Sequence, residues 1–335
     1  MKRSLIRLDD VADPANLVQA FWRAAQGKRH RPEVQRFERG LDGNLSLLRF
    51  EILSGAVSVG EYHRFEIHDP KRRTIHAPCF RERVLHHALM AFVEPVLDRY
   101  LIDDTFACRK GKGSWAAALR AQRHGRRCPW YLKLDIRSYF ASIDHGMLKR
   151  QIRRRLRGKP VLHLVDRILD AHQAAPGKGL PIGALTSQHF ANLYLSPLDR
   201  FLLEEVRVKG LVRYMDDLVV WHRDRQSLRT VLERARAFAS EHLRLEIKPS
   251  WQLQRSPCGL SLCGFRIFPG RLGLTARRRR RYRQARRKWE ESCRSGRITA
   301  EELQAGYSSA LAITHGAECL HWRRAELAGR PAVEA

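Results

Sequence analysis

Three aspartates stand where the chain could hold a metal ion. Asp135 ends the apolar run WYLKLD, and Asp216 and Asp217 form an adjacent pair between the apolar arms of LVRYMDDLVVW. Because both arms are apolar enough to be buried, the pair is expected in a rigid turn of a hairpin. Adjacent like charges are costly unless a cation neutralises them. Magnesium, a hard ion that binds carboxylate oxygen and keeps positions open for phosphate, is the expected cation.

The chemistry that this set implies is nucleotidyl transfer on a nucleic acid. Two ions about 4 Å apart would activate an attacking 3′-hydroxyl and stabilise the leaving pyrophosphate. The charge agrees, because 63 Lys and Arg against 35 Asp and Glu give a net charge of +28, and so basic a chain favours a polyanionic partner. With 44% hydrophobic residues, the chain has enough apolar surface to fold into packed subdomains.

The composition predicts a cytoplasmic protein. Its seven cysteines are odd in number and include no CxxC pair, so neither a disulfide framework nor a zinc ribbon is indicated. Acids interrupt the N-terminal segment before an apolar signal region forms, and no run of about eighteen uncharged apolar residues occurs. These features argue against secretion and membrane spanning.

Hydrophobic periodicity predicts the elements that must position the acids. Helical spacing in the first thirty residues breaks at GKRHRP, where Pro32 starts a second helix. Two short strands are predicted around the basic turn of DPKRRTIHAP, followed by a helix over 80–99. A buried strand over 131–136 delivers Asp135, and helix is predicted from there to about residue 171.

The rest of the chain is predicted in the same way. The Gly/Pro loop APGKGLPIG leads into a long amphipathic helix. The Asp-Asp hairpin, another helix and a second hairpin ending in LCGFRIFPGRLGL follow. In 277–288, nine of twelve residues are Lys or Arg. This block starts a separate, helical, very basic C-terminal subdomain.

Six motifs in order resemble the catalytic region of reverse transcriptases. YMDD, with Asp135 and then Phe140 upstream, resembles the palm, and DPKRRTIHAP and CRKGKGS resemble the two fingers motifs. LPIGALTSQHFAN resembles the motif that lines the nascent base pair, LEIKP the lysine motif of the palm, and CGFRIF the primer grip. The resemblance implies an α+β fold, a right-hand polymerase with fingers, an antiparallel-sheet palm and a small helical basic thumb.

The resemblance also implies subdomain boundaries. They are an N-terminal helical extension over 1–34, fingers over 35–130, a palm over 131–268 with a fingers excursion at about 150–180, and a helical thumb over 269–335.

Roles follow residue by residue from the same resemblance. The residues that it makes catalytic are Asp135, Asp216, Asp217 and Lys248, the last as the acid for pyrophosphate. The ligands of two Mg²⁺ ions, with Mn²⁺ as the alternative, are the same three aspartates and Ile136. The nucleotide-binding residues are Lys71, Arg73, Arg109, Lys112, Phe140, Ile182 and Gly183, with Phe140 excluding a 2′-hydroxyl and with Ile182 and Gln188 setting fidelity. The primer grip comprises Cys263, Gly264 and Phe265, and the nucleic-acid-binding residues of the thumb are Arg277, Arg278, Arg280, Arg283 and Arg287.

Several of these positions have an ordinary structural alternative. Lys248 can be a solvated charge at a strand end, and CRKGKGS can be a surface loop kept soluble by charge. An isoleucine such as Ile182 is typical of a core. The basic block can be a solvated helix face, although Tyr282 and Trp289 within it favour phosphate-backbone binding. Asp144, just before a helix, is predicted to be an N-cap rather than a catalytic acid.

Two departures from the common pattern indicate a branch of the family. Most reverse transcriptases carry Gln-Gly where this chain has Ile182-Gly183, and Ser-Pro where it has Ser187-Gln188. The pattern IGxxxSQ resembles the reverse transcriptases of diversity-generating retroelements, group II intron-like bacterial enzymes that copy a template RNA with errors opposite adenine. An aliphatic side chain at position 182 offers shape but no hydrogen bond, so a polar check on nucleotide placement is lost. The implied partners are template RNA, the RNA/cDNA duplex, dNTPs and a small basic pentameric accessory variability protein. The resemblance also implies that this protein is encoded by a bacterium or a phage.

Two other functions compete with this hypothesis. A reverse transcriptase of antiviral defence or abortive infection would share the catalytic motifs, whereas the C-terminal region has no VTG triplet, which counts against a retron enzyme. A neighbouring template-repeat and variable-repeat pair in the genome would decide for the retroelement. A catalytically silent RNA-binding scaffold predicts the loss of at least one metal-binding acid, and all three are present.

Overall fold

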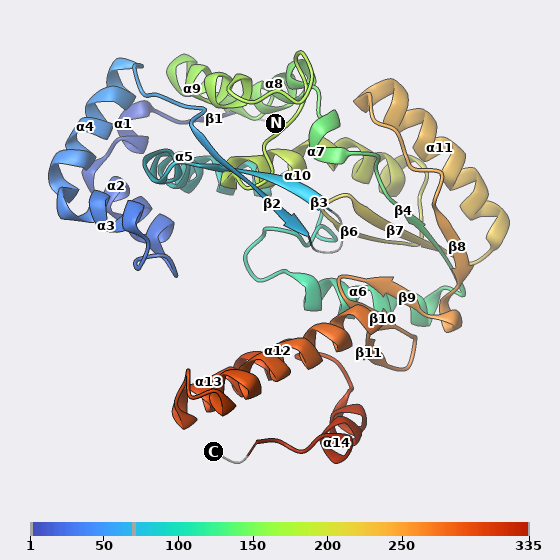
Figure 1. The fold of residues 1–335 in the computed structure, drawn as a ribbon. Helices are drawn as coiled ribbons and strands as arrows, with labels where there is room; N and C mark the ends of the chain where they lie inside the picture. The colour runs from blue at the N-terminus through green and yellow to red at the C-terminus, as the bar shows by residue number, and fades with distance from the viewer. Residues whose placement is uncertain (1–2, 69–71, 334–335) are drawn as a thin grey trace. The chain divides into compact units, whose positions relative to one another are not determined.

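The computed structural model describes residues 3–68 and 72–333 (Figure 1). The chain divides into two compact units, each assembled from separate segments. Unit 1 comprises Met1–Asp103, Ile136–Glu205 and Glu233–Pro249, and unit 2 comprises Asp104–Asp135, Val206–Leu232 and Ser250–Ala335. In the described part of the chain, no helix is long and apolar enough to cross a membrane, and all seven cysteines are free thiols.

Unit 1 is mainly helical, and its helices begin at sequence signals. Asp13 accepts hydrogen bonds from the amides of Ala15 and Asn16 before α2, which starts at Pro14. The third helix starts at Pro32, as the sequence predicts. The helices of unit 1 are α1 (Leu8–Val11), α2 (Pro14–Ala25), α3 (Pro32–Arg39), α4 (Leu41–Ser54), α5 (Phe80–Asp98), α7 (Tyr139–Ser142), α8 (His145–Arg153), α9 (Lys159–Asp170), α10 (Leu185–Arg200) and the π-helical turn Phe201–Glu205.

The strands of unit 1 form two small sheets. Antiparallel β2 (Tyr62–His68) and β3 (Arg72–Pro78) confirm the predicted hairpin, drawn as blue arrows in Figure 1. The prediction of continuous helix up to residue 171 is wrong at β5 (Leu156–Arg157), which separates α8 from α9. This short strand pairs in parallel with β1 (Ser4–Leu5), a partner about 150 residues away that no local pattern indicates.

Unit 2 is built around an antiparallel sheet of strand order β6-β7-β4-β8. Its strands are β4 (Trp130–Leu134), β6 (Gly210–Tyr214), β7 (Asp217–His222) and β8 (Gln252–Arg255). A second sheet contains β9 (Leu260–Leu262), β10 (Phe265–Ile267) and β11 (Leu272–Leu274), in the order β11-β10-β9. The helices are α6 (Ser114–Arg127), α12 (Ala276–Arg294), α13 (Ala300–Ala312) and α14 (Leu320–Gly329), with the 3₁₀ turn Ser256–Cys258, while α11 (Arg225–Leu243) has residues in both units.

One face of the four-stranded sheet forms the core of unit 2. Tyr131 of β4 and Trp221 of β7, each 0–1% exposed, belong to a buried cluster with alanines of α6 and apolar residues of β9, β10 and β11. Each large apolar side chain buried in this way contributes about 1.5–3 kcal/mol. The strands that precede and follow the three aspartates are therefore fixed in a core.

Candidate active site

The Asp216–Asp217 pair lies at the tip of the β6–β7 hairpin. Tyr214 pairs with Asp217 across the hairpin, so Met215 and Asp216 form a two-residue turn. Met215 has a φ of 57°, in the left-handed region that residues other than glycine rarely adopt. Both arms are buried, with Val212 and Val219 0% exposed. The prediction of a hairpin turn held between buried arms is confirmed.

The register of two strands places Asp135 beside this turn. β4 and β7 are antiparallel neighbours, and Leu134 pairs with Leu218. Asp135 directly follows Leu134, and Asp217 directly precedes Leu218. Both carboxylates therefore leave their strands at the same end of the sheet. The strand itself runs over Trp130–Leu134 and ends one residue before Asp135, whereas the sequence predicted 131–136.

Lys133 is a candidate that the sequence analysis missed. Its Nζ lies 3.0 Å from Asp217 Oδ1 and donates a hydrogen bond to the Ser261 carbonyl at 3.2 Å. Alternation along β4 places residues 133 and 135 on one face of the sheet, and this spacing is the signal that could have found it. The Lys133 ammonium supplies positive charge directly next to Asp217.

Three of the predicted nucleotide-binding segments are joined by backbone hydrogen bonds within unit 1. The Leu180 amide donates to the Phe140 carbonyl at 2.8 Å, and the His76 amide of β3 donates to the Ile182 carbonyl at 2.8 Å. Gly183 has a φ of +123°, and a Cβ there would lie 2.8 Å from Ile75 Cγ2. Glycine therefore permits the loop to approach the hairpin strand that also carries Arg73.

The remaining predicted residues of unit 1 fall in different settings. Lys71 lies outside the described residues. Gln188 is half-buried in the first turn of α10. Ile136 forms an isolated antiparallel bridge with Ile247, the residue before Lys248, and Lys248 is half-buried and has partners of its own.

Arg109 and Lys112 lie in the loop before α6, in unit 2. Arg109 Nη1 donates to the Thr105 carbonyl at 3.0 Å, and Lys112 Nζ lies 5.2 Å from the centre of the Phe106 ring. Both side chains thus fold back on their own loop, and both have further contacts. A triphosphate-binding role would require them to exchange some of these contacts for phosphate.

A cavity of about 630 Å³ in unit 2 contains Asp217 in its lining. The predicted primer-grip turn borders it through Cys263 and Gly264, whose φ values of 50° and 81° are those of a tight two-residue hairpin turn. Basic side chains from α12 complete this part of the lining: Arg277, Arg278 and Arg281. An acid and a row of cations thus face one space, which is the pairing needed to hold both a metal and a phosphate backbone.

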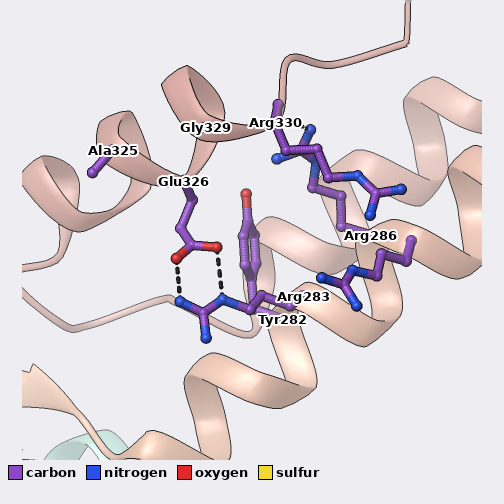
Figure 2. A pocket seen from close by; sticks show the side chains of 8 residues that line it. Tyr282, Arg283, Arg286, Ala325, Glu326, Gly329 and Arg330 are labelled. Carbon is purple, nitrogen blue, oxygen red and sulfur yellow. Dashed lines mark hydrogen bonds and ion pairs between the residues drawn. The ribbon is translucent and has the colours of Figure 1, made fainter.

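The arginines of α12 divide into two faces. Arg278 donates to the carbonyls of Ile313 and His315 and stacks 4.3 Å from the Phe265 ring centre. Figure 2 shows Arg283 held by Glu326 of α14, with Nε donating at 2.7 Å, beside a cavity of about 280 Å³. Arg286, 5% exposed, donates to Glu290 within α12 at 2.6 Å and to the carbonyls of Arg330 and Pro331, which follow α14. These arginines hold the helices of the C-terminal subdomain together.

The opposite face of α12 carries exposed cations at helical spacing. We call the following residues, all exposed, the α12 stripe: Arg277, Arg280, Arg281, Arg287 and Lys288. Steps of three and four residues return to one side of a helix. The stripe begins in the cavity that contains Asp217, because Arg277 and Arg281 line it.

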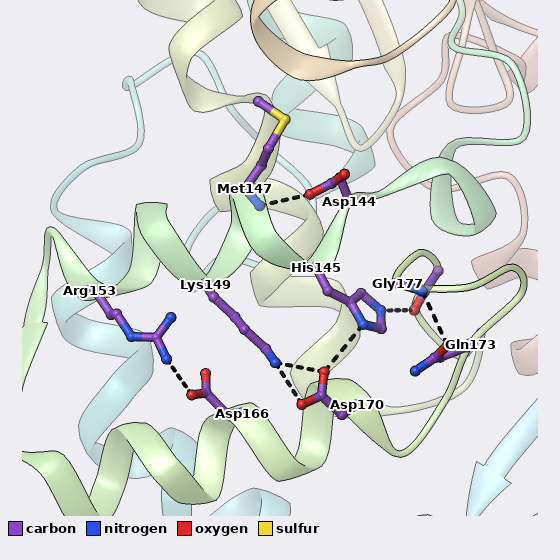
Figure 3. A network of polar contacts seen from close by, with 10 residues as sticks. Asp144, His145, Met147, Lys149, Arg153, Asp166, Asp170, Gln173 and Gly177 are labelled. Carbon is purple, nitrogen blue, oxygen red and sulfur yellow. Dashed lines mark hydrogen bonds and ion pairs between the residues drawn. The ribbon is translucent and has the colours of Figure 1, made fainter.

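Asp144 has the capping role that the sequence predicts. It is the N-cap of α8 and accepts from the Met147 amide at 2.8 Å (Figure 3). It also accepts from Arg244 Nη1 at 2.7 Å. Burial opposes ionisation, but the Met147 amide and Arg244 outweigh it and hold the pKa of Asp144 below its usual range. The same network pairs Lys149 with Asp170 at 2.6 Å. These acids are structural.

The family profile of the reverse transcriptase (RNA-dependent DNA polymerase) matches residues 68–250, more than half of the chain. The chain belongs to the reverse transcriptase family. An RNA-directed DNA polymerase domain of mixed helix and sheet, as the motifs predict, is confirmed. The matched residues include all three aspartates and end before the predicted primer grip and thumb.

Curated relatives of this reverse transcriptase domain include group II intron proteins. Protein YkfC of Escherichia coli K12 is 24% identical over 173 residues, 48% of this chain and 45% of that protein. Group II intron-encoded protein LtrA of Lactococcus lactis subsp. cremoris is 24% identical over 140 residues, 40% of this chain and 23% of that protein. The chain thus spans less than half the length of each. Apo telomerase from Candida tropicalis is a similar solved structure, with a TM-score of 0.49, 13% identity, and coverage of 88% of this chain and 64% of that one.

Reverse transcriptases generally use divalent metal ions, and the donor chemistry of this chain fits Mg²⁺. Carboxylate oxygens are the donors that hard cations prefer. Burial, and then the Asp217 carboxylate, raises the pKa of the Cys263 thiol to about 12. The described residues contain no group of three or more His, Cys, Asp and Glu side chains gathered closely enough to hold a metal. Magnesium binding by the three aspartates remains a prediction.

Proposed function

We propose that this protein is the reverse transcriptase of a diversity-generating retroelement, copying a template RNA into cDNA with errors opposite adenine. The observation that carries the proposal is the pair of departures in one segment, Ile182-Gly183 and Ser187-Gln188. The backbone hydrogen bond between Ile182 and His76 supports it, because position 182 is tied to the predicted nucleotide-binding hairpin. A basic pentameric accessory protein and a structured template RNA are the proposed partners.

The proposed chemistry is nucleotidyl transfer. Asp135, Asp216, Asp217 and the carbonyl of Ile136 would hold two Mg²⁺ ions, with Mn²⁺ as the alternative; when bound, the ions activate the primer 3′-hydroxyl and stabilise the leaving pyrophosphate. Lys248 would donate a proton to that pyrophosphate.

The remaining predicted residues would bind and orient the substrates. Guanidinium and ammonium groups suit a triphosphate because they donate several charged hydrogen bonds. The residues assigned to this task are Lys71, Arg73, Arg109 and Lys112. Phe140 would pack beneath the incoming sugar, and the turn at Cys263 to Phe265 would hold the end of the primer.

Replacing Ile182 by Gln is expected to lower misincorporation opposite adenine several-fold. A hydrogen bond near the nucleotide contributes about 1 kcal/mol net, and more where a buried group would otherwise be left unpaired. The measurement is deep sequencing of cDNA copied from one defined RNA by both proteins, with the accessory protein present. Ile182→Val is the matched control, since it stays apolar and should keep the wild-type error spectrum.

Two outcomes would contradict this proposal. Equal adenine error rates for the wild type and Ile182→Gln would show that Ile182 does not set the fidelity of copying. A wild-type enzyme that is accurate at adenine would reject the retroelement assignment and favour a reverse transcriptase of antiviral defence.

The α12 stripe is expected to bind the phosphate backbone of the template. Each arginine that meets a phosphate displaces a counterion, and the logarithm of affinity for single strands falls by about 0.7 per contact for each tenfold rise in salt. Changing Arg277, Arg280 and Arg281 to Gln should reduce this slope by about two units. The measurement is the dissociation constant of template RNA between low and physiological salt.

A charge-matched control removes three exposed arginines of unit 2 that lie outside α12: Arg271, Arg297 and Arg324. Their change to Gln should leave most of the slope in place. Equal slopes for the two triple variants would mean that the stripe has no special role and that only net charge matters.

A further inference from the structure

Arg213 is buried in the strand that leads into the catalytic turn. It lies in β6, one residue before Tyr214, and is 0% exposed. Leu211 and Val212 beside it are also 0% exposed. Taking a guanidinium out of water is costly unless its donors are well used. A strand residue that only had to fill this core would be apolar, so the position of the charge needs an explanation.

The guanidinium spans two segments of unit 2. Nη1 donates to the Met215 carbonyl at 3.1 Å, and Nη2 donates to the Thr105 hydroxyl at 3.4 Å. The backbones are also joined, because the Arg213 amide donates to the Asp104 carbonyl and the Phe106 amide donates to the Arg213 carbonyl, both at 2.9 Å. The segment 104–106 is thus paired along β6, and Arg213 extends this pairing to the hairpin turn.

The accepting carbonyl belongs to a residue with an uncommon backbone conformation. Met215 has its φ of 57° immediately before Asp216 and Asp217. A left-handed residue without glycine's freedom persists only where the surroundings hold it. The hydrogen bond from Arg213 to the Met215 carbonyl fixes the peptide between Met215 and Asp216, and hence the direction in which the two acids leave the turn.

Thr105 connects the same arginine to a second predicted function. Its hydroxyl accepts from Arg213, and its carbonyl accepts from Arg109 Nη1 at 3.0 Å. Arg109 belongs to the loop assigned to triphosphate binding. One threonine therefore ties the catalytic turn and that loop to a common point.

We propose that Arg213 is a positioning residue. It fixes the orientation of the catalytic turn through its hydrogen bond to the Met215 carbonyl, and it aligns that turn with the Arg109 loop through Thr105. The proposal rests on the proposed role of Asp216 and Asp217. It adds that the rate of the chemical step depends on a buried side chain that touches neither substrate nor metal. A small misplacement of reacting groups is enough to cost up to about a hundredfold in rate.

Single-turnover primer extension tests this role with three variants. Arg213→Met removes both donors, Arg213→Lys keeps the charge but not the fork that reaches two acceptors, and Thr105→Val removes one acceptor. We expect the rate constant to fall about tenfold or more for Arg213→Met and less for the other two. The reaction amplitude and the dissociation constant of the primer–template should stay within about twofold of the wild type.

Arg167→Met is the matched control. Arg167 of α9 also donates to two loop carbonyls, those of Gly55 and Val57, and no part of the proposed site includes it. Its loss should lower the melting temperature without slowing the burst. A merely structural Arg213 would behave in the same way, with a reduced amplitude and an unchanged rate constant.

The outcomes separate this inference from the proposed function. If Arg213→Met does not fold, Arg213→Lys and Thr105→Val decide, and wild-type rate constants for both would overturn the positioning role. If the Asp216→Asn/Asp217→Asn protein is inactive while these variants keep the wild-type rate, the catalytic role of the two acids is supported and the inference on Arg213 is rejected. If that double variant is fully active, the site assignment itself fails.

Discussion

The variant Asp216→Asn/Asp217→Asn is expected to extend a primer at least about a thousandfold more slowly than the wild type. Asparagine keeps the shape of the turn but removes the negative charge that would hold magnesium. A catalytic metal stabilises the transition state by several kcal/mol, and each 1.36 kcal/mol is tenfold in rate. The measurement is single-turnover extension on a defined RNA template across a magnesium titration.

An acid elsewhere in unit 2 provides the control. Asp224 is exposed and accepts a hydrogen bond from the Ser227 amide at 2.6 Å. Asp224→Asn removes one charge from the same unit and should keep the wild-type rate and melting temperature. A double variant at the wild-type rate would remove Asp216 and Asp217 from catalysis. A rate restored fully by more magnesium would mean that the carboxylates only tune metal affinity.

The hairpins of both units were predictable because the information that forms them is local. The apolar runs on both sides of Asp216 and Asp217 predict two paired strands, and the structure has β6 and β7 there. The helix caps are equally local, since Asp13 and Asp144 each accept from amides two or three residues ahead. For such features the chain segment and its partner lie within one short window.

Which arginines of α12 make structural contacts was not predictable, because their partners lie far along the chain. Arg278 contacts a carbonyl 35 residues away, and Arg283 pairs with a glutamate 43 residues away. Composition marks the whole 277–288 block as basic, but only tertiary contacts separate the α12 stripe from the arginines that hold α12, α13 and α14. Arg213 gave no signal either, because an arginine in a strand is ordinarily placed at an exposed position.

Lys133 shows an intermediate case. Its spacing of two from Asp135 places both on one face of a strand, which the sequence alone contains. That this face also meets Asp217 depends on the pairing of β4 with β7, about 85 residues apart in sequence. Sequence patterns thus predict which face a side chain takes, while the neighbour that it meets there requires the sheet order.

The second large effect is expected at Phe140. Phe140→Ala should lower the preference for dNTP over NTP by up to about a hundredfold, because a pocket that excludes a hydroxyl by its shape alone discriminates by about that factor. The rest of α7 is anchored independently of this ring: Tyr139 donates to the Ala191 carbonyl, and the Phe140 carbonyl accepts from the Leu180 amide at 2.8 Å. Truncation should therefore open space without unfolding the helix. Single-nucleotide insertion with matched dNTP and NTP measures the ratio of the two incorporation efficiencies.

Tyr139→Phe is the control, because it removes a buried hydrogen bond, costs about 1 kcal/mol of stability and should leave this ratio unchanged. The same ratio in Phe140→Ala and the wild type would make Phe140 an ordinary packing residue.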